Sequence, residues 1–191
     1  MAKILYLHGF NSSPASQKAQ QTHAWLAERG LAENLICPTL PSTPKAAAVF
    51  ISQIMEQHDP REITVFGSSL GGFLASWVAE KYGCRAALIN PAVRPAQLLH
   101  AYLGPQCNPY TGEEYLLEAH HMDELRALEP TSITTDRYWL LLETGDETLN
   151  YQDALSYYEG CKQTVFEGGD HSFQHWMEML PELIAWAGVV K

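Results

Sequence analysis

Short apolar segments alternate with amphipathic ones along most of the chain. Several of the apolar segments are hydrophobic on consecutive residues, which is typical of parallel strands whose two faces are both covered by helices. The segments that we predict to be strands are 3–7, 34–37, 62–66, 85–90, 137–143 and 162–166. This alternation predicts an α/β fold with a mostly parallel sheet of about six strands flanked by helices.

Three further segments have the periodicity of helices with one apolar face. In the first, the apolar stripe after residue 69 consists of Leu70, Phe73, Leu74, Trp77, Val78 and Tyr82. The second is predicted to start at Thr43 and Pro44, because threonine is a good N-cap and proline fits the first helical turn. The third, near the C-terminus, contains Pro181, which lacks an amide proton and is expected to kink or restart the helix.

The segment 91–136 interrupts the alternation of strands and helices. It contains five prolines and three tyrosines, with helical pieces predicted around 95–103 and 119–129. Long excursions of this kind in compact α/β domains commonly form binding elements. We therefore expect a small lid, and a packed loop without a binding role is the alternative.

Length and composition favour one domain over residues 1–191, since a chain of this size with 46% hydrophobic residues forms one substantial core. The strand from residue 3 leaves no room for a signal sequence, and no apolar run approaches a membrane span, so we expect a soluble, cytoplasmic protein.

A net charge of −10 without a basic cluster argues against nucleic-acid binding. The four cysteines lack zinc or redox spacing and are expected to be reduced and mostly buried. The oligomeric state stays open.

The pentapeptide Gly67-Ser68-Ser69-Leu70-Gly71 lies between a predicted strand and the first predicted helix. A serine between two such glycines on a sharp strand-to-helix turn is typical of the nucleophile elbow of α/β-hydrolases. The strained turn tolerates only small residues two positions to either side, so Ser69, not Ser68, is the candidate nucleophile. An ordinary glycine-rich loop is the alternative interpretation.

A serine nucleophile requires a base that takes its proton and an acid that orients the base. Asp146 follows the strand 137–143, and His171 follows the strand 162–166 after two glycines. The candidates therefore occur in the order Ser, Asp, His of α/β-hydrolases. Because ligand chemistry lies at the carboxyl ends of parallel strands, we expect these three side chains to lie together. Glu147 is the alternative acid.

An oxyanion hole is expected at the turn His8-Gly9-Phe10-Asn11 after the first strand, with the backbone amides of Phe10 and Leu70 as its donors. Two basic residues could face the same site. Lys18 lies just beyond this turn and Arg94 just beyond the fourth strand, which makes both candidates for binding an anionic group of a substrate. Solvated surface charges are the alternative.

No metal or cofactor is expected at this site. His171 and His175 have the i, i+4 spacing of a metal pair, but their segment lacks the glutamate of a zinc-protease helix, and no third ligand is evident. The adjacent pair His120 and His121 does not change this expectation.

Longer strings of the chain resemble those of the small bacterial YqiA-type esterases of the α/β-hydrolase superfamily. The strings are His8-Gly9-Phe10-Asn11-Ser12-Ser13-Pro14, Gly67-Ser68-Ser69-Leu70-Gly71-Gly72, Asn90-Pro91-Ala92-Val93-Arg94-Pro95, Asn108-Pro109-Tyr110-Thr111-Gly112 and Gly145-Asp146-Glu147. The resemblance spans essentially the whole chain. It implies a cytoplasmic carboxylesterase, with thioesters as a second class of substrate, in which Ser69, Asp146 and His171 are the triad.

The leading hypothesis is a serine carboxylesterase that hydrolyses small acyl esters through an acyl-enzyme on Ser69, with a small-molecule ester or thioester as its binding partner. An acyl-CoA thioesterase and a triad-bearing carbon–carbon bond hydrolase or lyase are alternatives. A non-catalytic binding module is a further alternative; such modules commonly lose a triad member, whereas this chain keeps all three. Because the lid is short, we expect short-chain esters to be preferred.

Overall fold

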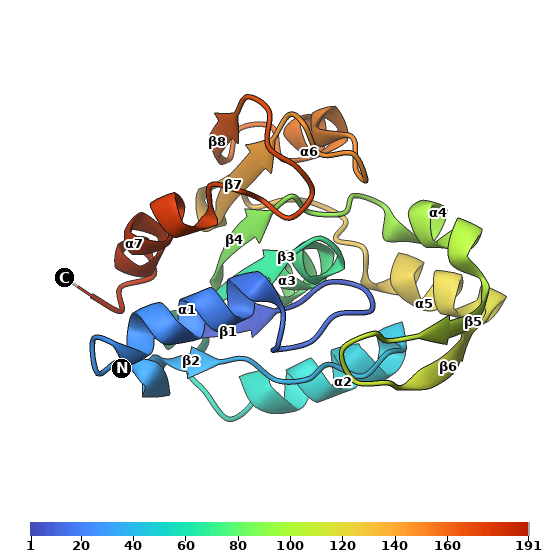
Figure 1. Cartoon of the computed structure of the whole chain (residues 1–191), viewed down its shortest axis with the longest axis horizontal. Helices are drawn as coiled ribbons and strands as arrows, with labels where there is room; N and C mark the ends of the chain where they lie inside the picture. The colour runs from blue at the N-terminus through green and yellow to red at the C-terminus, as the bar shows by residue number, and fades with distance from the viewer. Residues whose placement is uncertain (191) are drawn as a thin grey trace.

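Six parallel strands form one sheet in the computed structural model of the chain, which describes residues 1–190 (Figure 1). Their order across the sheet is β2-β1-β3-β4-β7-β8. The strands are β1 (Lys3–Leu7), β2 (Leu35–Ile36), β3 (Ile63–Ser68), β4 (Arg85–Ile89), β7 (Tyr138–Glu143) and β8 (Lys162–Phe166). Each lies within two residues of a segment predicted from the sequence. The predicted α/β fold with a mostly parallel sheet is confirmed.

Helices cover both faces of this sheet (Figure 1). One face is covered by α1 (Gln17–Ala27) and α7 (Trp176–Trp186), and the other by α2 (Pro44–Met55), α3 (Leu70–Tyr82) and α6 (Tyr151–Tyr157). Short 3₁₀ helices are η1 (Ala32–Asn34), η2 (Pro60–Glu62), η3 (His100–Tyr102) and η4 (Thr135–Arg137).

Strand β1 shows why the apolar pattern is continuous. Ile4 and Tyr6 lie in the core formed with α1 and α7, whereas Leu5 and Leu7 lie in the core formed with α2 and α3. Successive side chains of a strand point to opposite faces, so a strand covered on both faces is apolar at every position.

One of the two helix-terminus predictions is confirmed and the other needs correction. Thr43 is the N-cap of α2 and Pro44 lies in its first turn, but the Thr43 side chain makes no capping hydrogen bond. Helix α7 is continuous through Pro181, so the expected restart there is wrong. A proline inside a helix costs about 3 kcal/mol, whereas each large apolar side chain that is fully buried contributes about 1.5–3 kcal/mol. Helix α7 buries several of these on the sheet, namely Trp176, Leu180, Leu183 and Ile184.

The segment 91–136, here called the lid, forms two short helices and a hairpin. The helices α4 (Pro95–Leu99) and α5 (Ala119–Leu128) lie where the periodicity predicts them, and the hairpin pairs β5 (Gly104–Cys107) with β6 (Glu114–Leu117) in antiparallel fashion. The sequence pattern did not predict this hairpin, because β5 is Gly-Pro-Gln-Cys and the apolar run in β6 is only three residues long. Buried lid side chains join the core that contains Leu74 of α3; they are Leu99, Leu117, Met122 and Leu125. The lid is therefore packed onto the sheet domain.

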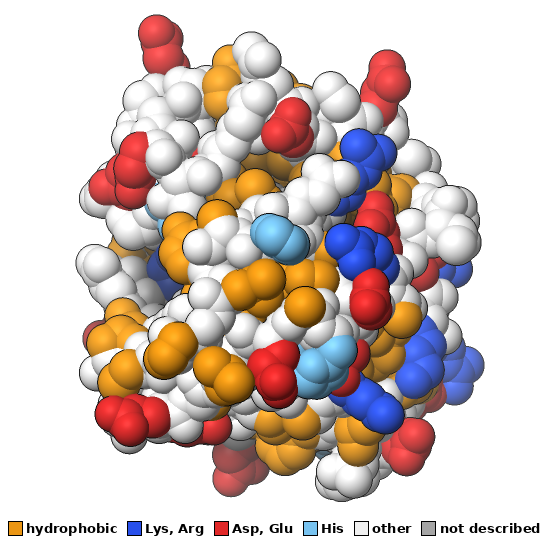
Figure 2. All heavy atoms as spheres, turned by 90° about the vertical axis from the view of Figure 1, so that its right-hand side faces the viewer, with side chains coloured by type: hydrophobic (Ala, Val, Ile, Leu, Met, Phe, Trp, Pro, Cys, Tyr) orange, Lys and Arg blue, Asp and Glu red, His pale blue; other side chains and the backbone are white. Residues whose placement is uncertain are grey.

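Apolar side chains also gather on the outer surface of the molecule at the lid end (Figure 2). Among the lid residues, Leu98, Tyr102, Tyr110 and Leu116 are between 40% and 52% exposed. The lid thus has one apolar face in the core and further apolar groups that contact solvent.

The expectations for thiols and membranes can be compared with the coordinates. All four cysteines are free; Cys84 and Cys161 are buried, Cys37 is half-buried and Cys107 is exposed. Among residues 1–190, no helix has the length and apolar character that crossing a bilayer requires.

Candidate active site

Ser69 lies directly after β3 and immediately before α3, in a backbone conformation that few residues adopt. Its φ is 56° and its ψ is −121°. A positive φ of this kind is strained for any residue with a side chain and is found where the surrounding structure enforces it. The flanking glycines allow the turn, because a Cβ on Gly67 would lie 2.2 Å from the carbonyl oxygen of Gly71. This is the geometry of a nucleophile elbow.

Ser69, His171 and Asp146 form one chain of hydrogen bonds. His171 Nε2 lies 3.1 Å from Ser69 Oγ, and His171 Nδ1 lies 2.8 Å from Asp146 Oδ2 and 3.0 Å from Asp146 Oδ1. An aspartate accepts the proton of Nδ1, which leaves Nε2 as the acceptor for the serine hydroxyl. The three predicted side chains are therefore brought together in the arrangement that activates a serine.

The turn after β7 gives its two carboxylates different partners. Asp146, whose side chain is 2% exposed, also accepts hydrogen bonds from the backbone N–H groups of Thr148 and Leu149, at 2.9 and 2.8 Å. Glu147 accepts instead from the backbone N–H of His171, at 3.0 Å. Asp146 thus binds the imidazole ring of His171, and Glu147 binds the backbone N–H of the same histidine.

The two predicted oxyanion donors lie on either side of Ser69. Phe10 is in the turn after β1, and Leu70 is the first residue of α3. A Cβ on Gly9 would lie 3.2 Å from the Cβ of Ser69, so this turn approaches the elbow closely. Within residues 1–190, the N–H groups of Phe10 and Leu70 have no hydrogen-bond acceptor. Both remain free to bind an oxyanion, and the N-terminus of α3 adds partial positive charge.

The ring of His8 and the side chain of Asn11 hold the turn that carries Phe10. His8 Nε2 accepts the backbone N–H of Leu40 at 3.0 Å, and its Nδ1 lies 3.1 Å from the carbonyl oxygen of Gly9. Burial lowers the pKa of His8, so its ring is neutral and can accept from one side while donating from the other. Asn11 accepts from the hydroxyl of Tyr115 in the lid at 2.8 Å. Sequence reasoning did not assign these roles to His8 and Asn11.

Lys18 faces the cleft that contains Ser69 and His171. Its Nζ donates to the backbone carbonyl of Ser172 at 2.6 Å. Burial lowers the pKa of the Lys18 ammonium to about 8. The neighbouring carboxylates act in the opposite direction; they are Asp170, Glu143 and Asp146. The positive charge of Lys18 is therefore already surrounded by negative charge before any substrate binds.

Arg94 does not reach this cleft, so the expectation that it faces the site is corrected. It is the N-cap of α4 with a φ of 52°, and its Nε lies 3.7 Å from Glu129 Oε1. It lines surface grooves with residues such as Thr131 and Tyr157 rather than with the triad. The carboxylate of Glu129, at the end of α5, gives the guanidinium a partner within the lid.

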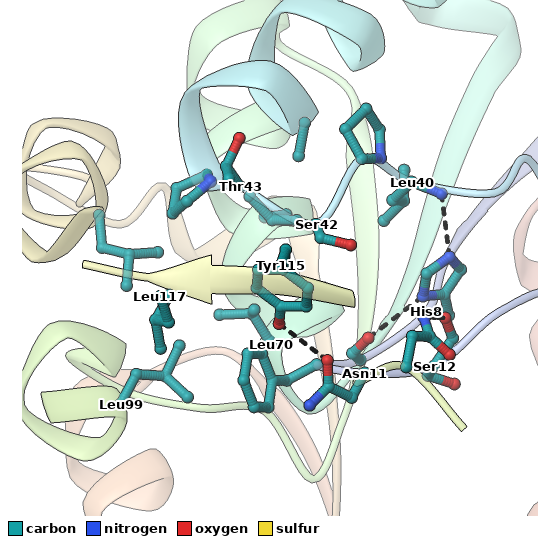
Figure 3. A pocket seen from close by; sticks show the side chains of 18 residues that line it. His8, Asn11, Ser12, Leu40, Ser42, Thr43, Leu70, Leu99, Tyr115 and Leu117 are labelled. Carbon is teal, nitrogen blue, oxygen red and sulfur yellow. Dashed lines mark hydrogen bonds between the residues drawn. The ribbon is translucent and has the colours of Figure 1, made fainter. Parts of the chain in front are cut away.

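Two hollows share the turn that carries Phe10 as part of their walls. The open cleft beside Ser69 and His171 has a volume of about 400 Å³ and is lined both by polar side chains, including Asn11 and Lys18, and by apolar surface. A much smaller pocket of about 40 Å³ lies behind the turn, under the lid (Figure 3). Leucines dominate its apolar wall; they are Leu40, Leu70, Leu74, Leu99, Leu117 and Leu125.

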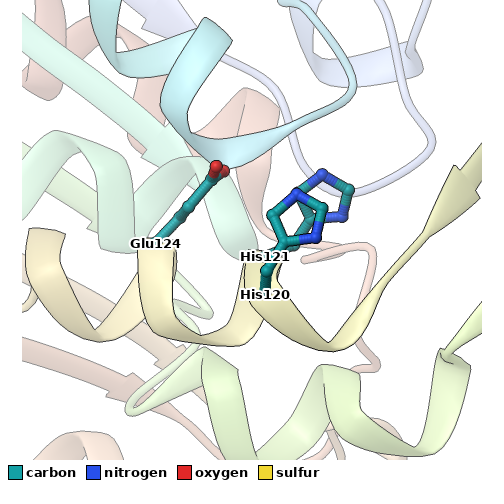
Figure 4. A group of neighbouring side chains, drawn as sticks. All are labelled: His120, His121 and Glu124. Atoms are coloured by element: carbon teal, nitrogen blue, oxygen red, sulfur yellow. The ribbon is translucent and has the colours of Figure 1, made fainter.

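The histidine pairs considered as metal ligands have other partners. His175 Nδ1 lies 2.7 Å from Glu143, so His171 and His175 each bind a different carboxylate. On α5, ligand atoms of His120, His121 and Glu124 lie within 4.8 Å of one another (Figure 4). However, His121 Nδ1 accepts the backbone N–H of Glu118, which leaves the ring proton on Nε2. Glu124 accepts the backbone N–H of Lys45 in the first turn of α2. These groups cap two helices.

Asn90 and Glu143 lie around His171, and the sequence pattern assigns no role at the site to either of them. Glu143 is the last residue of β7, and Asn90 directly follows β4. Glu143 is 0% exposed and Asn90 is 2% exposed. A polar residue at the carboxyl end of a buried apolar strand is the signal that could have found both, and it is the same signal that indicates Asp146.

The site lies at the carboxyl ends of β3, β7 and β8, on a parallel sheet with helices on both faces, and this architecture is that of an α/β-hydrolase. The chain belongs to UPF0227, a YqiA-like family described as an uncharacterised protein family, whose family model matches residues 3–188. The resemblance to the YqiA-type proteins is thereby confirmed.

Solved structures share the fold at low sequence identity. A protein from Agrobacterium vitis S4 described as a hydrolase has a TM-score of 0.77 and 18% identity, with 97% of this chain and 87% of that chain covered. Mouse alpha/beta hydrolase domain-containing protein 10 has a TM-score of 0.70 and 17% identity, covering 96% and 88%. Est1E from Butyrivibrio proteoclasticus has a TM-score of 0.69 and 13% identity, covering 99% and 89%. These similarities establish the fold.

The separate partners of Asp146 and Glu147 lead to a paired prediction. Asp146→Asn should lower kcat for an ester by about 10⁴-fold, because an amide cannot hold the histidine tautomer that accepts the serine proton. Glu147→Gln should keep most of the activity, since its amide oxygen can still accept from the His171 backbone. Steady-state kinetics of both purified variants test this. If Glu147→Gln loses its activity and Asp146→Asn keeps it, the acid that orients His171 is Glu147.

Proposed function

We propose that this protein is a serine carboxylesterase that hydrolyses small acyl esters. The observation that carries the proposal is the continuous chain of hydrogen bonds from Asp146 through His171 to Ser69, with the serine on a strained elbow. A buried carboxylate, an imidazole and a hydroxyl in this order are what nucleophilic catalysis by serine requires.

The geometry supports a two-step reaction. Ser69 Oγ attacks the ester carbonyl carbon while His171 Nε2 takes the hydroxyl proton, and the oxyanion is held by the N–H groups of Phe10 and Leu70. The protonated His171 then gives its proton to the departing alcohol, which leaves an acyl group on Ser69. In the second step, His171 takes a proton from water as the water attacks the acyl carbon, and it returns that proton to Ser69 as the acid product leaves.

The small pocket behind the oxyanion turn supports a short acyl group. About 10–15 Å³ of such space holds one water molecule, so 40 Å³ accommodates about three groups the size of a methylene. The wider cleft, which has a mixed polar and apolar lining, is open to solvent and fits the alcohol side of an ester. We therefore place acyl chains of about butyryl length in the leucine-lined pocket.

An acyl-CoA thioesterase is the second candidate, because Lys18 brings one positive charge into the cleft. The carboxylates that surround Lys18 favour a neutral substrate over an anionic one. The net charge of −10 acts in the same direction. We therefore rank the neutral ester first.

The nucleophile assignment predicts that Ser69→Ala abolishes covalent labelling by a fluorophosphonate and lowers ester hydrolysis by several orders of magnitude. Ser68→Ala is the matched control, because Ser68 is the adjacent, buried residue at the end of β3, and it should keep both labelling and activity. Gel fluorescence and p-nitrophenyl butyrate hydrolysis provide the two measurements. Persistent labelling of the Ser69→Ala protein would show that the nucleophile lies elsewhere.

The leucine-lined pocket predicts a preference for butyryl over palmitoyl esters. Leu117→Ala should shift the preference toward hexanoyl esters by about 4-fold in kcat/KM for each further methylene buried, which corresponds to about 0.8 kcal/mol. Leu116→Ala is the control, because the Leu116 side chain is 51% exposed whereas that of Leu117 is buried in the pocket wall.

The outcome that would replace this account is a higher kcat/KM for palmitoyl-CoA than for butyryl esters. If that activity also fell with added salt and disappeared in Lys18→Ala, the protein would be a thioesterase that uses Lys18 to bind the CoA anion.

A further inference from the structure

A second carboxylate–imidazole pair lies next to the candidate triad. The side chain of Glu143, at the end of β7, is 0% exposed. Its Oε1 accepts from His175 Nδ1 at 2.7 Å and from the His175 backbone N–H at 3.0 Å. Its Oε2 accepts from the backbone N–H of Asp170 at 2.7 Å. One buried carboxylate thus binds residues on both sides of His171.

The Glu143 carboxylate is ionised despite its burial. Burial alone would raise the pKa of Glu143, but the hydrogen bonds from His175 and Asp170 outweigh this effect and hold the pKa below its usual value. An ionised carboxylate inside a protein is stable only when its oxygens are satisfied by donors. Here those donors belong to the segment that carries His171.

Asn90 holds the same segment from the next strand. Its Oδ1 accepts the backbone N–H of Glu143 at 3.0 Å, and its Nδ2 donates to the carbonyl oxygens of Asp170 at 3.0 Å and His171 at 3.4 Å. Asp170 is therefore fixed at both its N–H and its carbonyl group. The residue directly before His171 has no freedom to shift along the sheet edge without breaking these bonds.

The remaining contacts of Glu143 and His175 make this arrangement specific. Gly169 has a φ of +71°, and a Cβ on it would lie 1.8 Å from Glu143 Oε2, so the loop passes against the carboxylate with no side chain between them. The His175 ring stacks on Phe166 at a centroid distance of 4.0 Å and an interplanar angle of 7°. The far end of the turn is tied by Lys18 through the carbonyl group of Ser172.

We infer that Glu143 is a positioning residue for His171: its carboxylate, together with Asn90, sets the place of the histidine loop and thereby the alignment of His171 Nε2 with Ser69 Oγ. This role rests on the esterase mechanism proposed above. Because catalysis is sensitive to displacements of about 1 Å, a loosened loop lowers the rate of proton transfer while the cleft that binds substrate keeps its shape.

Glu143→Gln tests the inference with little change in volume. The glutamine side chain has an NH2 group in place of one carboxylate oxygen. That donor would face a backbone or ring N–H of Asp170 or His175, so neither donor would have an acceptor. We expect kcat for p-nitrophenyl butyrate to fall by about 100-fold with KM changed less than about 2-fold. Fluorophosphonate labelling of Ser69 should slow by a similar factor, since it requires the same base.

Glu80→Gln is the matched control. Glu80 lies on α3, has a side chain that is 18% exposed and accepts from Thr134 and from the hydroxyl of Tyr138 at the start of β7, the opposite end of that strand. Loss of its hydrogen bonds should lower the melting temperature and leave kcat unchanged. A merely structural role for Glu143 would give the same pattern.

The possible results distinguish a positioning role of Glu143 from a merely structural role. If Glu143→Gln folds, loses thermal stability like Glu80→Gln and keeps its kcat, the inference is overturned. If Glu143→Gln does not fold, Asn90→Gly decides the matter, because glycine accepts the φ of 40° at this position and removes only the side-chain bonds. A folded Asn90→Gly variant with lowered kcat and unchanged KM supports the inference, and one with unchanged kcat overturns it. If the wild-type protein shows no hydrolysis that depends on Ser69, the proposed function itself has failed.

Discussion

The close packing of the elbow after β3 against the end of β1 is the constraint on which the candidate site depends. A Cβ on Gly71 would lie 2.0 Å from the carbonyl oxygen of Leu7. That obstacle is main chain, which cannot rotate away as a long side chain can. Only glycine at this position lets the N-terminus of α3 approach β1. This approach brings the backbone amide of Leu70 and the turn at Phe10 close to Ser69. Ser69 keeps its positive φ of 56° within this close-packed turn.

The rest of the site follows from the edge of a parallel sheet. Strands β3, β7 and β8 end at the same edge, so residues far apart in the chain, Ser69, Asp146 and His171, meet there without a long loop. The lid completes the site on the other side of the elbow. Its hairpin is joined to the oxyanion turn by hydrogen bonds from Tyr115 to Asn11 and from Asn108 to the carbonyl group of Ser12. The same segment that lines the leucine-rich pocket therefore also steadies the turn that carries Phe10.

The sequence allowed the strands and the three triad candidates to be predicted, because each signal is local. An apolar run predicts a buried strand, and a polar residue just after the run predicts chemistry at the sheet edge. The features that were missed or misplaced depend on contacts between distant residues. The place of the lid hairpin against the turn after β1 depends on Tyr115 and Asn11, which are 104 residues apart. Arg94 is drawn to Glu129 rather than to the cleft. Pro181 is tolerated because α7 is held by its buried face.

The central claim is that Ser69 becomes acylated during turnover. The most direct test is to mix the protein rapidly with excess p-nitrophenyl butyrate, quench in acid during the first turnovers, and determine by peptide mass spectrometry where the butyryl group is attached. The account predicts a burst of p-nitrophenolate of about one equivalent per enzyme and a butyryl adduct on the peptide that contains Ser69. Turnover with a butyryl adduct on a different residue, or with no adduct and no burst in any quench time, would contradict it.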